Sequence, residues 1–110
     1  MAVDRDMIWS GYDEDGVECC VARSQWMGHV AKRPEIEDAL DLTIQAIVSP
    51  ESVEADPARP DEPNRRFRLL VVSGSGPWEG YNLRVSVKCV RQETGEWVKF
   101  YQSCWCERAQ

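Results

Sequence analysis

The segment from Lys32 to Ile47 is suited to one local structure, a corner followed by an amphipathic helix. Pro34 fits the first position of a helix, because that position needs no backbone N–H donor. The acidic side chains of Glu35 and Glu37 then lie at the positive end of the helix dipole. Apolar residues recur every three or four positions, at Ile36, Leu40, Ile44 and Ile47. The pattern predicts a helix that begins at Pro34, packs one face on the core and ends at Ser49-Pro50.

A histidine lies just before this corner. The residue that precedes a proline is pushed toward extended geometry, so we expect Arg33 to separate the helix from a shorter one over Ser24 to Lys32. The shorter segment contains His29, the only histidine of the chain. An imidazole moves protons near neutral pH, and the adjacent cations Lys32 and Arg33 would stabilise negative charge on phosphate oxygens. The pattern is compatible with a phosphate-handling site, although an isolated histidine in an amphipathic segment more often has a packing or surface role.

The remaining segments have the patterns of strands. Residues 82–90 alternate between apolar and polar side chains, and Arg65 to Ser73 and Trp97 to Trp105 also indicate strands, with Ser52 to Ala55 as a short edge strand. An Asp15-Gly16 turn between two extended runs predicts an N-terminal hairpin. We therefore expect an α+β fold with two N-terminal helices packed on a twisted antiparallel sheet. Residues 1–23 would form an extra hairpin and residues 24–110 the main domain, within one globular unit.

Charge is distributed unevenly along the chain. The net charge is −6, which argues against a nucleic-acid partner. Residues 34–63, however, carry nine acidic side chains and one basic one, whereas residues 64–110 carry eight basic and four acidic ones. A local cationic surface for a polyanion therefore remains compatible with the sequence. The chain lacks a long apolar run and its first residues lack the pattern of a signal peptide, so we expect no membrane association and a cytoplasmic location.

The five cysteines do not have the spacing of a zinc site. Cys19 and Cys20 are adjacent, and Cys104 and Cys106 lack the two-residue gap that lets two thiolates bind one metal ion. Buried thiols are the expected state, and we expect neither a metal nor another cofactor. A metal site formed by Cys89, Cys104, Cys106 and His29, or a redox role, is the alternative.

The order of the short motifs resembles a known family. Trp26, His29-Val30, Arg33-Pro34-Glu35, a helix ending near Ser49-Pro50-Glu51-Ser52-Val53, the strand element Arg66-Phe67-Arg68 and the closing Val98-Lys99-Phe100-Tyr101 follow one another as in certain small nucleases. This arrangement resembles the phage and polymorphic-toxin branch of the barnase/EndoU/colicin/RelE-like (BECR) nucleases. The resemblance extends from about Ser24 to Tyr101.

The resemblance implies an activity. It implies a toxin-like, metal-independent endoribonuclease, in which the ribose 2′-OH attacks its own phosphate. It assigns catalytic roles to His29, Arg66, Arg68 and Tyr101, the histidine as general acid or base and the tyrosine as a donor to the departing oxygen. The expected substrate-binding cations are Lys32, Arg33, Lys99 and Arg84. RNA is the implied substrate, and an antitoxin or immunity protein the implied partner.

The chain departs from the family pattern at two points. Lys99-Phe100 replaces a common threonine-alanine pair, and the second histidine that often precedes Pro-Glu is absent. A catalytically inactive binding module is therefore the alternative function, with the acidic helix or the proline-rich segment 56–64 docking a protein or nucleic acid.

Overall fold

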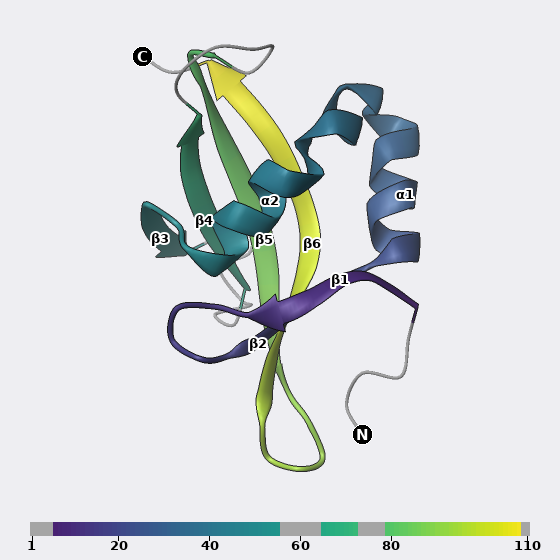
Figure 1. Ribbon diagram of the computed structural model, residues 1–110, viewed down its shortest axis with the longest axis vertical. Helices are drawn as coiled ribbons and strands as arrows, with labels where there is room; N and C mark the ends of the chain where they lie inside the picture. The colour runs from purple at the N-terminus through teal and green to yellow at the C-terminus, as the bar shows by residue number, and fades with distance from the viewer. Residues whose placement is uncertain (1–5, 56–64, 73–78, 109–110) are drawn as a thin grey trace.

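Figure 1 shows the computed structural model, which describes residues 6–55, 65–72 and 79–108. The described strands form one six-stranded sheet in the order β1-β2-β6-β5-β4-β3. The helices lie on one side of this sheet (Figure 1). The elements in chain order are β1 (Met7–Tyr12), β2 (Glu18–Ala22), α1 (Arg23–Lys32), the 3-10 helix η1 (Pro34–Ala39), α2 (Leu40–Val48), β3 (Ser52–Ala55), β4 (Arg65–Val72), β5 (Tyr81–Arg91) and β6 (Trp97–Arg108).

The helical region confirms the predicted corner and refines the predicted helix. Arg33 has φ −136° and ψ 78°, so the chain leaves helical geometry there before it enters η1 at Pro34. The first turns form a 3-10 helix, in which side chains three residues apart share a face. Ile36 and Ala39 are consequently both buried, and the buried face continues through Thr43, Ala46 and Ile47. Leu40 and Ile44 are only half-buried, so the core-facing stripe is rotated from the predicted one.

The N-terminal hairpin is part of the main sheet. β1 pairs with β2 antiparallel around a turn in which Gly16 has φ +78°, as the Asp-Gly signal predicts. β2 then pairs in parallel with β6, over Glu18 to Cys20. The sheet is therefore mixed, and the prediction of an all-antiparallel sheet is wrong. Parallel pairing joins segments far apart in sequence through a long connection, so neither local periodicity nor turn residues indicate it.

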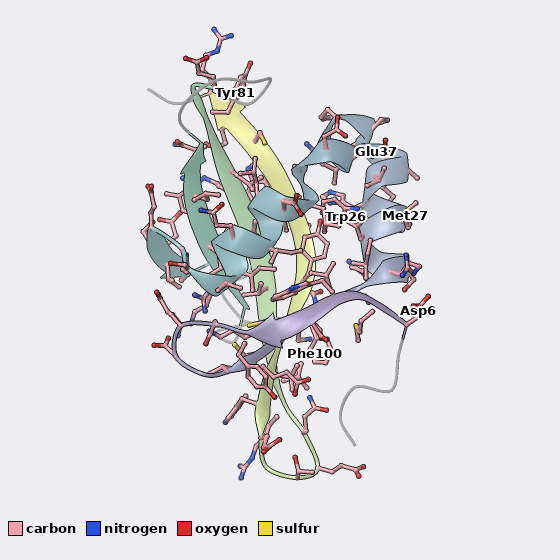
Figure 2. The ribbon with its side chains drawn as sticks, in the orientation of Figure 1. Asp6, Trp26, Met27, Glu37, Tyr81 and Phe100 are labelled. Atoms are coloured by element: carbon pink, nitrogen blue, oxygen red, sulfur yellow. The ribbon has the colours of Figure 1, made fainter. Side chains whose placement is uncertain are left out.

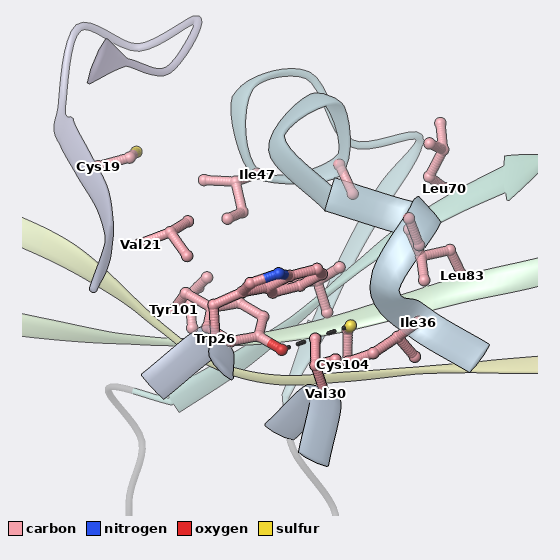
Figure 3. Close-up of a cluster of buried hydrophobic side chains, with 14 residues drawn as sticks. Cys19, Val21, Trp26, Val30, Ile36, Ile47, Leu70, Leu83, Tyr101 and Cys104 are labelled. Atoms are coloured by element: carbon pink, nitrogen blue, oxygen red, sulfur yellow. Dashed lines mark hydrogen bonds between the residues drawn. The ribbon is translucent and has the colours of Figure 1, made fainter. Parts of the chain in front are cut away.

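The other strands follow the predicted alternation. β5 pairs antiparallel with β4 and β6, and β3 is an edge strand on β4. Leu83, Val85 and Val87 of β5 are buried, as expected for a face covered by helices. Trp26 of α1 packs against Tyr101 of β6 with ring centroids 5.5 Å apart, and Figure 3 shows this pair in the core. The predicted α+β class is confirmed. None of the described helices is long and apolar enough to cross a membrane.

Candidate active site around His29

A chain of short polar contacts links His29 on α1 to the core. His29 Nδ1 lies 2.9 Å from the hydroxyl of Tyr101 on β6. The same hydroxyl lies 3.4 Å from Cys104 Sγ, a contact drawn as a dashed line in Figure 3. Thr43 of α2 donates its hydroxyl to that sulfur at 3.7 Å. The imidazole is thus held at Nδ1 by Tyr101 of β6, and the contacts continue through Cys104 to Thr43 of α2.

This geometry fixes which nitrogen of the imidazole is available. Nδ1 also lies 3.4 Å from the backbone nitrogen of Cys104, so Nε2 is the nitrogen left for a ligand. A tyrosine hydroxyl both donates and accepts hydrogen bonds. When Nδ1 carries the ring proton and donates it to the Tyr101 hydroxyl, that hydroxyl donates to Cys104 Sγ and Nε2 is unprotonated. In this tautomer Nε2 can accept a proton while the ring keeps its orientation.

The edge of β6 explains why His29 lies here. β2 pairs with β6 only as far as Phe100, and α1 follows directly after β2. Beyond Phe100, α1 side chains contact the β6 edge: Gln25 Nε2 donates to the carbonyl oxygen of Gln102 at 2.6 Å, and His29 Nδ1 lies 3.4 Å from the backbone nitrogen of Cys104. Gln102 is an extra residue in β6, because Ser86 pairs with Ser103 and Val87 with Tyr101. Such bulges are common beside active sites, where they redirect side chains.

His29 opens onto a pocket of about 330 Å³, which we call the His29 pocket. It is lined by Ser24, Gln25, Gly28, His29, Lys32, Gln102 and Ser103. The pKa of His29 is lowered from its ordinary value of 6.5 by burial and by the charges of Arg33 and Lys32, against the smaller effect of Glu35. The imidazole is therefore neutral at neutral pH, beside an exposed ammonium group. Such a site can accept a proton and stabilise an anion.

Arg68 and Lys99 lie in a second cluster. Both contact the buried carboxylate of Asp13, Lys99 through a hydrogen bond and Arg68 at 3.9 Å. The side chains of Arg68 and Asp13 are 7% and 1% exposed, so this cluster is part of the interior. Among the described residues, two cations thus share one carboxylate, and Arg68 Nε is buried without a hydrogen bond. Because neither cation lines the His29 pocket, the structure does not bring these two predicted residues to the histidine.

The remaining predicted cations are also apart from His29. Arg66 is exposed on β4, in register with Ala55 and Val87. Arg84 points to the opposite sheet face from Val85 and forms ion pairs with Glu54 and with Glu107, the latter at 2.7 Å. Tyr101 is 2% exposed and contacts the imidazole from the core side, and burial raises its pKa. Of the eight predicted site residues, the structure gathers His29, Lys32, Arg33 and Tyr101.

Sequence reasoning missed several residues that contact His29 or that form the Asp13 cluster. Asp13 accepts the backbone N–H groups of Asp15 and Val17, each at 2.9 Å, and thereby shapes the hairpin turn. An aspartate three residues before a turn glycine is a signal for this role. Cys104, Gln25 and Gln102 carried no comparable signal, because their roles depend on the position of α1 along β6.

The cysteines lie within the described residues and form no disulfide. Cys19, Cys20 and Cys104 are buried, and Cys89 and Cys106 are half-buried. Burial raises the pKa of Cys19 to about 11, which keeps its thiol protonated. Within residues 6–55, 65–72 and 79–108, no three His, Cys, Asp or Glu side chains gather in a way that could hold a metal ion. The suggested set of His29 with Cys89, Cys104 and Cys106 does not form such a group.

Comparisons of the chain with family models, with curated proteins and with solved structures found no match.

Proposed function

We propose that this chain is a metal-independent endoribonuclease with His29 at its active site. The observation that carries the proposal is the half-buried imidazole, held at Nδ1 by Tyr101 and kept neutral by burial and by Arg33 and Lys32. Cleavage of RNA by its own 2′-OH needs a base for that hydroxyl and positive charge on the phosphorane oxygens. The order of motifs from Trp26 to Tyr101 supports the further proposal that the fold is of the BECR type.

The proposed roles follow the positions of the residues. His29 Nε2 accepts the proton of the ribose 2′-OH, and Lys32 and Arg33 stabilise the charge that develops on phosphate. Tyr101 is a positioning residue, because its hydroxyl contacts the imidazole and is buried behind it. The departing 5′-oxygen takes a proton from solvent, which the open pocket admits. Arg68 and Lys99 stabilise the fold as the counter-ions of Asp13 and have no contact with the substrate.

A cleavage assay in EDTA tests this proposal. The wild-type chain should cleave a labelled single-stranded RNA, and His29→Gln should lower the initial rate by about 100-fold or more. Lys32→Gln should lower it by at least about tenfold, because a stabilising charge is lost. Arg91→Gln removes the same charge from an exposed residue outside the pocket and should leave the rate unchanged. Undiminished cleavage by His29→Gln would disprove the assignment.

An exposed acidic surface favours a second candidate function. Glu35, Glu37, Asp38 and Asp41 are exposed on η1 and α2. Such a surface repels RNA and attracts a basic protein. On this proposal the chain is an inactive binding module that docks a partner such as an antitoxin or immunity protein. The proline-rich segment 56–64 lies outside the described residues. A binding module would give no cleavage with any variant in the same assay.

A further inference from the structure

A second pocket borders the His29 pocket. It has a volume of about 300 Å³ and we call it the Phe100 pocket. Its lining comprises Ala22, Gln25, Lys88, Val90, Gln92, Phe100, Tyr101 and Gln102. Phe100 and Lys88 are direct partners across β5 and β6, so their side chains lie on the same face of the sheet. Figure 2 shows Phe100 just below β1, away from Glu37.

The two pockets share a boundary. Gln25 and Gln102 line both of them, and the bond from Gln25 Nε2 to the Gln102 carbonyl oxygen joins α1 to β6 at that point. A flexible polymer bound across this hydrogen bond places one of its monomers beside His29 and the next monomer beside Phe100. Lysines stand on both sides of the boundary, with Lys32 in the first pocket and Lys88 in the second. This arrangement suits a polymer with an anionic backbone.

The lining of the Phe100 pocket suits a nucleobase. An aromatic ring offers a stacking surface, and lysine offers a contact for a phosphate. Gln92 adds a directed polar group. Its Nε2 donates to the carbonyl oxygen of Val90 at 3.2 Å, and because only the amide nitrogen can donate, the orientation of the amide is set. Gln92 Oε1 is then an acceptor for an amino group on a base edge.

We propose that the Phe100 pocket binds the base next to the cleaved phosphate, stacked on Phe100, with an exocyclic amino group donating to Gln92 Oε1. Lys88 contacts the following phosphate. The inference rests on the proposed ribonuclease function and names its substrate as single-stranded RNA. Adenine carries a suitable amino group and uracil does not. The site therefore favours adenine over uracil at this position.

Binding of a non-cleavable analogue tests the pocket separately from catalysis. The probes are fluorescent 2′-O-methyl tetranucleotides of adenosine and of uridine, measured by fluorescence anisotropy. Phe100→Leu keeps an apolar side chain but removes the stacking surface, and it should raise the Kd of the adenosine probe about tenfold or more. Gln92→Ala should remove the preference for adenosine over uridine. Tyr12→Leu is the control, because Tyr12 is 67% exposed and lines neither pocket.

The outcomes separate the two proposals. If cleavage depends on His29 but Phe100→Leu binds the adenosine probe with wild-type affinity, the proposed base-binding site is wrong. The proposed ribonuclease function then still stands. Weaker binding by Phe100→Leu without cleavage by any variant would support the pocket and overturn the function. Equal wild-type affinity for both probes would overturn the Gln92 assignment. Near-ultraviolet circular dichroism of Phe100→Leu checks that the half-buried position tolerates the change.

Discussion

The reactivity of His29 is set by its immediate neighbours. Burial disfavours the charged imidazolium, and the cations Arg33 and Lys32 disfavour it further, so the pKa lies below 6.5. The unfolded chain binds a proton at this residue more readily than the folded one does. The contribution of His29 to folding stability therefore falls as the pH drops through 6.5 and below.

Titration of the ring by NMR measures this effect on the single histidine. The midpoint for the wild-type chain should lie below 6.5. The double variant Lys32→Gln/Arg33→Gln should raise it, because removal of two cations favours the protonated form. Arg91→Gln should leave it in place. A midpoint at or above 6.5, or one insensitive to the double variant, would show that the local electrostatic account is wrong.

Tyr101→Phe tests the positioning role. The variant keeps the ring that packs on Trp26 and loses only the hydroxyl 2.9 Å from Nδ1. The free energy of unfolding should fall by about 1–2 kcal/mol, because the contacts of the hydroxyl with Nδ1 and with Cys104 Sγ are both lost. The kcat for RNA cleavage should fall about tenfold with KM unchanged, because orienting partners act on the reacting group and leave substrate contacts in place. A normal kcat in a destabilised variant would limit Tyr101 to packing.

At the scale of elements, one carboxylate joins three strands and a turn. Asp13 follows β1, shapes the turn toward β2, and holds Lys99 of β6 and Arg68 of β4. Burial by itself raises the pKa of Asp13, but the Lys99 contact and the N–H groups of Val17 and Asp15 outweigh it and lower the pKa below 3.8. The stabilisation is complete above the pKa of the unfolded carboxyl and is lost as pH falls through the lower folded value.

Asp13→Asn should lower the free energy of unfolding by about 3–5 kcal/mol, because it leaves two buried cations without a counter-ion. Urea denaturation at pH 7 measures the change. Asp15→Asn, an exposed substitution in the same turn, should stay within about 0.5 kcal/mol of the wild type. The difference between wild type and Asp13→Asn should shrink at pH values below 3.8. A variant as stable as the wild type would show that the cluster contributes nothing to the fold.

At the scale of the whole molecule, the N-terminal hairpin completes the sheet. β2 contributes Cys19, Cys20 and Val21, all 0% exposed, and its pairing with β6 joins residues separated by most of the chain. The predicted division at residue 23 therefore falls between two elements that pack on the same strand. The described sheet shows no separate unit on either side of that boundary.

A chain that begins at Ser24 should not fold cooperatively. Its loss of β2 exposes the β6 edge and removes buried side chains from the core. The near-ultraviolet circular dichroism spectrum should lose its tryptophan signal. Thermal unfolding should show no cooperative transition. Tyr12→Thr in the full chain, at an exposed position of the same hairpin, should unfold like the wild type. A folded fragment with the Tm of the full chain would show that the hairpin is an independent extension.

Sequence reasoning succeeded where the determinants are local. Pro34 and Arg33 indicated the corner, the alternation in residues 82–90 indicated β5, and helical spacing placed Lys32 beside His29. Sequence reasoning failed where the pairing register of distant strands decides which side chains meet. Nothing near Lys99 in the sequence indicates Asp13, 86 positions away, and the parallel pairing of β2 with β6 has no local signature. Arg84 was an intermediate case, because its position between inward-facing Leu83 and Val85 already placed it on the opposite sheet face from them.

The chemical nature of the RNA ends after cleavage distinguishes attack by the ribose 2′-OH from hydrolysis by water. A short synthetic RNA is incubated in EDTA with the wild-type chain or with His29→Gln, and the masses of the products are measured by mass spectrometry. Attack by the 2′-OH should give a 2′,3′-cyclic phosphate paired with a 5′-hydroxyl, formed by the wild type and reduced about 100-fold or more in His29→Gln. Ends bearing a 3′-hydroxyl and a 5′-phosphate, equal product from both chains, or no cleavage at all would contradict it.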